Sequence, residues 1–398
     1  MDNEQFLSFS ASGFSLPQEE VVELKKSSKS LIIGIPKEIL LEEKRIGLSP
    51  DAASLLINNG HQVIMERGAG NSCSFTDQEY SEAGVKIVEN PEEIFSSDII
   101  LKVSPPTLGE INMMKNGKTL ISALQLKIQK KEFFKKLMDK KATAIAYDYI
   151  QDEDGIFPVV RSMSEIAGNS SILIAAECLN SFNGGRGILL GSIAGVSATN
   201  VVVLGAGTVG EFATRSALAL GASVKVFDNS LHKLRRIQDR LGVIIDNSML
   251  HPKVLEKAIR RADVVIGAVR VKDRRTPCII SEEMIKLMKP QSVIVDVSID
   301  RGGCFETSEI TSHSNPTFIK HDVIHYCVPN IPSRMARTAS FSLSNIFSTL
   351  LMKIGKYGGV QNAIINNHKI GNGVYIINGN LINKGIGEWY NLPYKSLE

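Results

Sequence analysis

Cysteine is scarce in this chain of 398 residues, and the five cysteines that occur lie far apart in the sequence. They form no CxxC pair and show no Cys/His spacing of the kind that binds a metal. This pattern argues against a disulfide framework, and we expect no metal site. A reducing cytoplasm fits it best.

A large excess of charge of one sign is also missing. The formal net charge is only +3, and the basic residues are scattered along the chain. We therefore expect no nucleic-acid partner. The KSSK stretch at 26–29 and the arginine pair at 235–236 are expected to be solvated surface.

Long hydrophobic runs are absent too. The N-terminal sequence MDNEQFLSFSASGF lacks the basic start and apolar core of a signal peptide. A membrane span needs about 20 consecutive apolar residues, whereas the best candidate, residues 340–355, is interrupted by polar side chains. Its apolar residues recur at helical spacing, which predicts an amphipathic core helix. We expect a cytoplasmic protein without membrane insertion.

What is present is a regular alternation of strand and helix signals. Apolar runs at 31–38, 61–68, 98–104, 119–126 and 143–150 predict strands in the first part of the chain. Between them, Ser49 and Pro50 suit the start of a helix, and Thr76 with Glu79 forms a capping box. Further strands are expected at 200–204, 262–269, 291–298 and 323–329. This alternation predicts an α/β fold with parallel sheets covered on both faces.

A glycine-rich turn carries the strongest functional signal. Gly205, Gly207 and Gly210 form GxGxxG directly after an apolar strand and at the start of a helix. Glycines at these places let the backbone approach a pyrophosphate, whose charge the helix N-terminus stabilises. Asp228, eighteen residues after the last glycine, would bind the ribose hydroxyls and repel the extra phosphate of NADP. Since Asn229 and Ser230 supply no positive charge, we expect NAD.

Polar residues just past later strands are candidates for the nicotinamide and substrate region. Asp300 and Asn330 both follow apolar strands of the second series. Two interpretations of Asp300 stay open on spacing alone, a site residue or a loop carboxylate in the turn SIDRGG.

Seven motifs, in order and spacing, resemble the alanine dehydrogenase and transhydrogenase α-subunit family, closest to alanine dehydrogenase. They are GIPKE, KRIGLSP, NNGHQVIMERGAG, SMSEIAG, GAGTVG, SVIVDVSIDRGG and HYCVPNIPSRMARTAS, between residues 34 and 340. The resemblance implies two Rossmann-like, doubly wound domains with the active site between them, the first domain discontinuous. We expect a polar lead at 1–30, a substrate domain at 31–160 plus 338–398, and an NAD-binding domain at 161–337.

The family implies an activity and a set of site residues. Its enzymes convert L-alanine, water and NAD to pyruvate, ammonium and NADH, commonly as homohexamers. Arg45 matches the arginine that holds the substrate carboxylate, a role suited to its bidentate fork, although on sequence alone an exposed loop residue is the other interpretation. Met163 and Ser164 match cofactor-contacting positions, Asp300 the active-site aspartate, and Asn330 a residue near the nicotinamide.

Two residues depart from the family pattern. Ser104 stands where alanine dehydrogenases carry a substrate-contacting lysine, and Gln125 where they carry a proton-transferring histidine. Loss of a positioned acid or base removes about 10² to 10⁴ in rate. Strand alternation places Lys102 on the same face as Ser104, so one hypothesis has Lys102 reach into the vacated space. The alternative is a lysine that extends along the surface, as in the active enzymes.

Two other functions therefore stay open beside L-alanine dehydrogenase. One is a catalytically weak NAD-binding protein that senses the nucleotide or regulates a partner. The other is a subunit like the transhydrogenase α-subunit, whose reaction needs no such Lys and His. The sequence around 152–168 resembles the dehydrogenase branch more closely.

Overall fold

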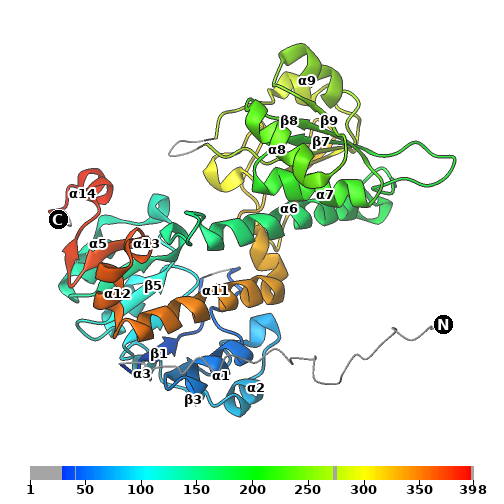
Figure 1. Ribbon diagram of the computed structural model, residues 1–398. Helices are drawn as coiled ribbons and strands as arrows, with labels where there is room; N and C mark the ends of the chain where they lie inside the picture. The colour runs from blue at the N-terminus through cyan, green and yellow to red at the C-terminus, as the bar shows by residue number, and fades with distance from the viewer. Residues whose placement is uncertain (1–28, 41, 272–275, 396–398) are drawn as a thin grey trace, which may run out of the picture.

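The computed structural model describes residues 29–40, 42–271 and 276–395, so nearly all of the predicted polar lead lies outside the described residues. Figure 1 shows two lobes, each built on a sheet with helices around it, with the long helices α6 (Pro158–Leu179) and α11 (Ala336–Lys356) running between them. The predicted α/β class with two domains is confirmed.

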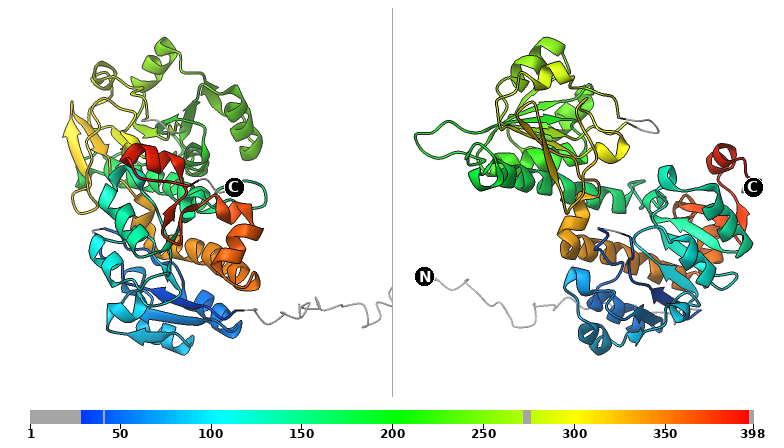
Figure 2. Two further views of the ribbon diagram at one scale, coloured as in Figure 1. Left: turned by 90° about the vertical axis from the view of Figure 1, so that its left-hand side faces the viewer. Right: turned by 180° about the vertical axis from the view of Figure 1, so that it is seen from behind.

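The first sheet draws strands from both ends of the chain. Its spatial order is β15 (Asn380–Leu381), β14 (Val374–Ile377), β6 (Thr143–Ala146), β5 (Thr119–Ser122), β4 (Ile99–Leu101), β1 (Ile32–Ile35), β2 (Gln62–Glu66) and β3 (Lys86–Val88). The C-terminal elements lie beside β6 and helix α5, as the side view and the view from behind in Figure 2 both show. This is the discontinuous arrangement that the sequence predicts.

The second sheet lies wholly within the middle of the chain. Its order is β12 (Thr317–Lys320), β13 (Val323–Tyr326), β11 (Val293–Asp296), β10 (Val264–Gly267), β7 (Asn200–Leu204), β8 (Ser223–Phe227) and β9 (Asp246–Ser248). Both sheets are mainly parallel, as predicted. The sequence analysis missed antiparallel pairings at their edges, where β12 pairs with β13, and β14 with both β6 and β15.

Helices connect the strands and cover the sheets. They are α1 (Pro50–Asn58), α2 (Asp77–Glu82), α3 (Pro91–Ile94), α4 (Leu108–Met113), α5 (Lys131–Asp139), α7 (Thr208–Ala219), α8 (Leu231–Leu241), α9 (Pro252–Ile259), α10 (Glu282–Ile285), α12 (Val360–Asn366), α13 (His368–Gly371) and α14 (Lys384–Tyr390), besides α6 and α11. The predicted caps are confirmed. The Ser49 hydroxyl accepts the Ala52 N–H at the start of α1, and Thr76 and Glu79 form a reciprocal capping box on α2.

Strand order reverses at one place in each sheet. In the first sheet β1 lies between β2 and β4, and in the second β7 lies between β8 and β10. Loops that leave the carboxyl ends of these strands diverge to opposite faces, and ligands of such folds bind at that point. The residues after β1 and β4, and those after β7 and β10, are therefore the places to look for a site.

Helix α6 joins the two lobes without a break. The predicted domain boundary at 160/161 falls inside α6, and the boundary at 337/338 falls in the first turn of α11, so these exact limits stay predictions. At Gly168 an added Cβ would lie 2.5 Å from the Val209 carbonyl oxygen. Glycine is needed there because α6 and α7 pack backbone to backbone.

The predicted amphipathic helix at 340–355 forms most of α11, with Leu343, Phe347 and Leu351 in the core of the first domain. Across the described ranges, no helix combines the length and apolar character that a bilayer crossing requires.

Candidate functional site

The glycine-rich turn lies between β7 and α7, as predicted, and its three glycines have different reasons to be glycine. Gly205 has φ +103°, and a Cβ there would meet the Ala268 carbonyl oxygen at 2.5 Å. A Cβ on Gly210 would lie 1.8 Å from the Gly205 oxygen. A Cβ on Gly207 would meet nothing within 4 Å, so the space over the turn is open. The turn thus fits a pyrophosphate at the N-terminus of α7.

Asp228 lies at the end of β8, beside this turn. Its two carboxylate oxygens accept the N–H groups of Ala206 and Ser230, each at 2.8 Å. A carboxylate has about four acceptor positions, so hydroxyls of an adenosine ribose could bind the others. The sequence analysis missed Lys233, whose Nζ lies 3.7 Å from Asp228 Oδ2. Lys233 stands in the first turn of α8 and partly offsets the charge of Asp228.

The expectation that both arginines at 235–236 are solvated surface was wrong for Arg236. Its Nη2 donates to the Ala206 carbonyl oxygen at 2.9 Å, and its side chain is half-buried. On helix α8, Arg235 is two positions after Lys233 and does not share its face, whereas Arg236, three positions after Lys233, does. Two adjacent arginines in the sequence could not show by themselves that this face of α8 meets the glycine-rich turn.

A second group of residues meets around the carboxylate of Glu43, in the loop after β1. Glu43 Oε1 accepts from the backbone N–H of Arg45 at 3.1 Å and from Arg45 Nε at 2.8 Å. Glu43 Oε2 accepts from Arg45 Nη2 at 2.6 Å, from the Ser104 hydroxyl at 3.1 Å and from Asn330 Nδ2 at 3.2 Å. We call Glu43, Arg45, Ser104 and Asn330 the Glu43 network; it joins the loops after β1, β4 and β13.

Both charges of the network are buried. Glu43 is 7% exposed and Arg45 8%. Burial alone would raise the pKa of Glu43, but the hydrogen bonds and charge of Arg45, with the Ser104 hydroxyl, outweigh it and lower that pKa. Burial opposes the charge of Arg45 as well, yet Glu43 raises the pKa of the guanidinium. Both groups therefore stay ionised, and their charges cancel.

Arg45 still has donors for a ligand. A guanidinium carries five N–H groups. Two go to the Glu43 carboxylate, and Arg45 Nη1 lies 3.4 Å from the sulfur of Met163 on α6. These contacts leave one N–H on each terminal nitrogen. The interpretation of Arg45 as an exposed loop residue was therefore wrong, because the side chain is buried beside the other domain.

Lys102 lies in a neighbouring buried cluster. Its ammonium is 2.7 Å from Glu110 Oε1 and 3.4 Å from Glu38 Oε2. Burial would lower the pKa of Lys102, but the two carboxylates outweigh it and raise that pKa. Its connection with Ser104 runs through Glu38, whose Oε2 is 3.4 Å from the Ser104 N–H. The side chain of Lys102 turns into this cluster and does not extend along the surface.

Glu38 ties the loop after β1 to the end of β4. Its Oε1 accepts the Val103 N–H at 2.6 Å. Burial raises the pKa of Glu38 to about 7, against the lowering effect of Lys102. In the sequence Glu38 stands out only as part of the GIPKE motif. What could have marked it as a site residue is its place shortly after β1, where the strand order reverses.

The other predicted residues lie at strand ends or on α6. Gln125 follows β5 with an exposed side chain and a left-handed backbone, φ +45°. Asp300 follows β11 in the 3₁₀ helix Ile299–Arg301, where its charge acts on Arg270. Ser164 donates its hydroxyl to the Val160 carbonyl oxygen at 2.6 Å, within α6. Asn330 has φ +55°, a conformation that asparagine tolerates better than most residues.

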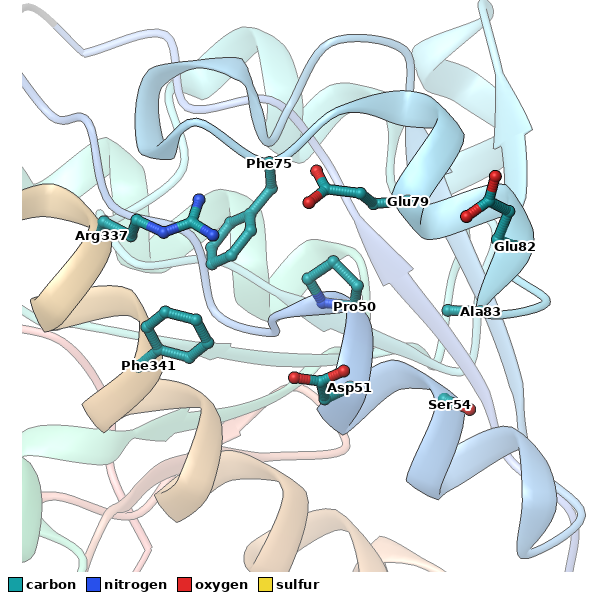
Figure 3. A pocket seen from close by; sticks show the side chains of 9 residues that line it. All are labelled: Pro50, Asp51, Ser54, Phe75, Glu79, Glu82, Ala83, Arg337 and Phe341. Atoms are coloured by element: carbon teal, nitrogen blue, oxygen red, sulfur yellow. The ribbon is translucent and has the colours of Figure 1, made fainter.

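A surface hollow elsewhere contains none of these residues. It is lined by Pro50, Asp51, Ser54, Phe75, Glu79, Glu82, Ala83, Arg337 and Phe341, and Figure 3 shows Arg337 extending along the Phe75 ring. The Arg337 guanidinium lies 4.3 Å from the centre of that ring, a distance typical of a cation–π contact. Within residues 29–40, 42–271 and 276–395 no cluster of His, Cys, Asp and Glu has the arrangement of a metal site.

We expect Gly207→Ala to weaken NADH binding at least about tenfold, roughly 1.4 kcal/mol, while the melting temperature is unchanged. The added methyl group meets no protein atom within 4 Å but projects into the space expected for the pyrophosphate. Titration of NADH fluorescence measures the affinity. Gly109→Ala, whose Cβ would have only one neighbour at 3.8 Å, is the matched control and should bind NADH normally. Equal affinities would place the pyrophosphate elsewhere.

We expect Glu43→Gln to lower the free energy of unfolding by about 3–5 kcal/mol at pH 7, because it leaves Arg45 buried without a counter-charge. Since the folded pKa of Glu43 is below its ordinary value of 4.5, its contribution is present above that pH and is lost on acidification. The difference from the wild type should therefore shrink below pH 4.5. Urea unfolding at several pH values measures it.

Ser104→Ala is the control, since it removes one hydrogen bond and leaves the ion pair; about 1 kcal/mol should be lost. A Glu43→Gln protein no less stable than Ser104→Ala would show that Arg45 does not depend on Glu43.

Comparison with known proteins agrees with this geometry. The description "Alanine dehydrogenase/PNT, N-terminal domain" matches residues 34–167, and "Alanine dehydrogenase/PNT, C-terminal domain" matches residues 171–384. Alanine dehydrogenase of Staphylococcus saprophyticus is 38% identical over 369 residues, covering 92% of this chain and 99% of the relative. The Staphylococcus epidermidis enzyme is 39% identical over 367 residues, with 92% and 98% covered.

Solved structures give the same picture. An L-alanine dehydrogenase aligns with a TM-score of 0.86 and 34% identity, covering 91% of this chain and 99% of that one. A transhydrogenase from Sinorhizobium meliloti aligns at 0.77 and 24% identity, covering 89% and 99%, which shows a shared fold. The matches span both lobes and the junction between them, and the chain therefore belongs to the alanine dehydrogenase/PNT family of NAD-dependent oxidoreductases.

Proposed function

We propose that this protein is an NAD-dependent L-alanine dehydrogenase, which converts L-alanine, water and NAD to pyruvate, ammonium and NADH. One observation carries the proposal: the Glu43 network holds a buried arginine with two N–H groups to spare at the place where the two domains meet. Paired N–H groups of a guanidinium bind a carboxylate bidentately. The relatives that cover nearly the whole chain carry the same name.

In this proposal Arg45 binds the substrate carboxylate, and Glu43 and Met163 orient the Arg45 guanidinium. Asp300, on the nucleotide-binding side, organises the water or the amino group. Asn330 bonds Glu43 and so links the substrate anchor to the loop after β13. Lys102 acts through Glu38 as a positioning residue, since its ammonium is held by two carboxylates.

The cofactor would be held by the turn with Gly205, Gly207 and Gly210 and by Asp228, with Met163 and Ser164 of α6 beside the nicotinamide. When bound, NAD accepts the hydride from the substrate α-carbon. Exclusion of water from the buried Glu43 network strengthens the pull of Arg45 on the substrate.

The proposed enzyme is slow. Gln125 cannot titrate, and Ser104 gives its hydroxyl to Glu43. A missing acid or base at position 125 is worth about 10² to 10⁴ in rate, and an uncharged side chain at position 104 gives no electrostatic pull on a developing oxyanion. The same two residues favour a second candidate function, a catalytically weak NAD-binding protein that senses the nucleotide.

We expect the double variant Ser104→Lys with Gln125→His to oxidise NADH, in the presence of pyruvate and ammonium, about 10² to 10⁴ times faster than the wild type. Lysine at 104 would face the Glu43 carboxylate that now accepts the serine hydroxyl, and histidine at 125 would supply a group that titrates near neutral pH. Absorbance of NADH measures the rate.

Two control proteins accompany this assay. Gln129→His adds a histidine to the same segment outside the predicted site and should leave the rate unchanged, whereas Asp300→Ala should abolish the wild-type rate. Turnover that survives the loss of Asp300 would come from a contaminant or another site. A wild type that binds NADH but turns over no keto acid would favour the sensor.

We also propose a homo-oligomer, as family members commonly form homohexamers. Apolar side chains are exposed on the segment after α6, with Phe182 98%, Leu189 66%, Ile193 58% and Val196 61% exposed. This green segment projects from the nucleotide-binding lobe in Figure 1, and a contact with another copy would bury it. Light scattering should give a multiple of 43.5 kDa, and Phe182→Ser with Ile193→Ser should lower it; a monomeric wild type would contradict the proposal.

A further inference from the structure

Asp148 occupies the third of three adjacent strand ends. The strands β4, β5 and β6 are neighbours with parallel pairing, Leu101 opposite Ile121 and Ser122 opposite Ala146. Ser104 follows β4, Gln125 follows β5, and Asp148 follows β6 in the 3₁₀ helix Tyr147–Tyr149. Carboxyl ends of parallel strands meet at one edge of the sheet, so Asp148 lies at the same edge as the two substituted positions.

One oxygen of the Asp148 carboxyl group is unused by the fold. Oδ1 is buried and has no hydrogen-bond partner in the part of the chain that the structure describes. A buried polar atom without a partner destabilises the fold. Such an atom in a native protein calls for an explanation, and a ligand that bonds it is one.

The groups around Asp148 come from four elements. Burial raises the pKa of Asp148 to about 6, while the backbone N–H groups of Asp148 and Leu124 and the charges of Arg45 and Arg270 oppose this rise. Tyr147, in the same 3₁₀ helix, and Tyr375, on β14, also lie near it: burial raises the pKa of both phenols, and the Asp148 charge adds to the rise.

Two of these neighbours locate Asp148 relative to the reaction. Arg45 is the proposed substrate anchor. Arg270 follows β10 in the nucleotide-binding domain and interacts with Asp148 and with Asp300. Asp148 therefore faces the junction of the two domains, between the carboxylate anchor and the nucleotide side.

The other carboxylates near the anchor are occupied. Glu43 accepts five hydrogen bonds, from Arg45, Ser104 and Asn330. Both oxygens of Glu38 are engaged as well, Oε1 by Val103 and Oε2 by Lys102 and Ser104. Asp148 differs from both because it combines a position at this edge with an oxygen that has no partner.

We propose that Asp148 is the proton-transfer residue of the dehydrogenase reaction, in place of the non-titratable Gln125. This rests on the proposed function. The amino group of L-alanine reacts after losing one proton to water. Once hydride has left the α-carbon and the C=N bond has formed, water attacks that carbon, the electron pair of the C=N π bond returns to nitrogen, and one water proton passes to the Asp148 carboxylate. Asp148 then gives this proton to the nitrogen, the C–N bond breaks, and the departing ammonia takes the hydroxyl proton as C=O forms. Ammonium leaves, and Asp148 is again a carboxylate.

The experiment compares Asp148→Asn with the wild type in the oxidative direction, with L-alanine and NAD. The carboxylate form is needed for attack by water, so the wild-type rate should rise with pH through about 6. Asp148→Asn should lack this rise, and its steady-state rate should be about 10² to 10⁴ lower. Because hydride transfer precedes the attack by water, the variant should still form NADH rapidly in its first turnover.

Three further measurements separate proton transfer from a structural role. In the cofactor-free proteins, infrared absorption of protonated carboxylic acids should be stronger in the wild type than in Asp148→Asn below pH 6, and this difference should disappear as the pH rises through about 6. The buried carboxyl groups of Glu38 and Asp296, whose pKa values burial raises to about 7 and about 6, absorb in both proteins and cancel in the difference. Asp148→Glu should recover part of the rate and a pH limb. Asp154→Asn, an exposed aspartate in the following turn, is the matched control and should behave as the wild type.

The outcomes are distinct. An active wild type with an Asp148→Asn variant of equal rate and equal pH profile overturns this proposal and leaves the dehydrogenase function standing. Loss of the first-turnover NADH together with the steady-state rate also overturns it, because Asp148 would then serve substrate binding. A wild type that binds NADH without any turnover overturns the dehydrogenase function, and this proposal with it.

Discussion

The buried carboxylate of Glu43 is the constraint on which the site depends. A carboxylate shielded from water is costly unless it is paired and hydrogen-bonded, and Glu43 meets that need with donors from both domains. Arg45 supplies the charge, Ser104 a hydroxyl and Asn330 an amide. The loops after β1, β4 and β13 are therefore fixed relative to one another by one side chain, and the guanidinium of Arg45 is fixed with them.

The two sheets share one feature of their strand order. Each reverses its strand order once, and in each the loops at that point carry the contacts described above. In the nucleotide-binding sheet the reversal brings Gly205 against the carbonyl of Ala268, and in the other sheet it brings Glu38 against the N–H of Val103. Gly205 allows the first contact because it has no side chain, and the buried Glu38 carboxylate makes the second by accepting a hydrogen bond. This difference suits the loop after β7 to a diphosphate and the loop after β1 to the Arg45 guanidinium.

Local features were predictable from the sequence because their causes are local. The Ser49 and Thr76 caps, the α11 helix and the glycine-rich turn depend on residues a few positions apart. The Glu43 network was not predictable, since Glu43 and Asn330 are 287 positions apart and neither belongs to a periodic pattern. Lys102 was expected on the same face as Ser104, but its partner Glu110 comes from the next helix, α4, and could not be predicted. Asp148 gave no signal, because the sequence predicts a strand over 143–150, whereas β6 ends at Ala146 and leaves the Asp148 Oδ1 buried without a partner among the described residues.

Helix α6 belongs to both lobes. Its second turn carries Met163 against Arg45, and its middle packs closely on α7 at Gly168. A helix of 22 residues is a rod of about 33 Å. The sulfur of Met163 and the close contact at Gly168 are five residues apart, about 7.5 Å along this axis, so a tilt of the nucleotide-binding lobe that moves α7 would also move Met163 against the Arg45 guanidinium.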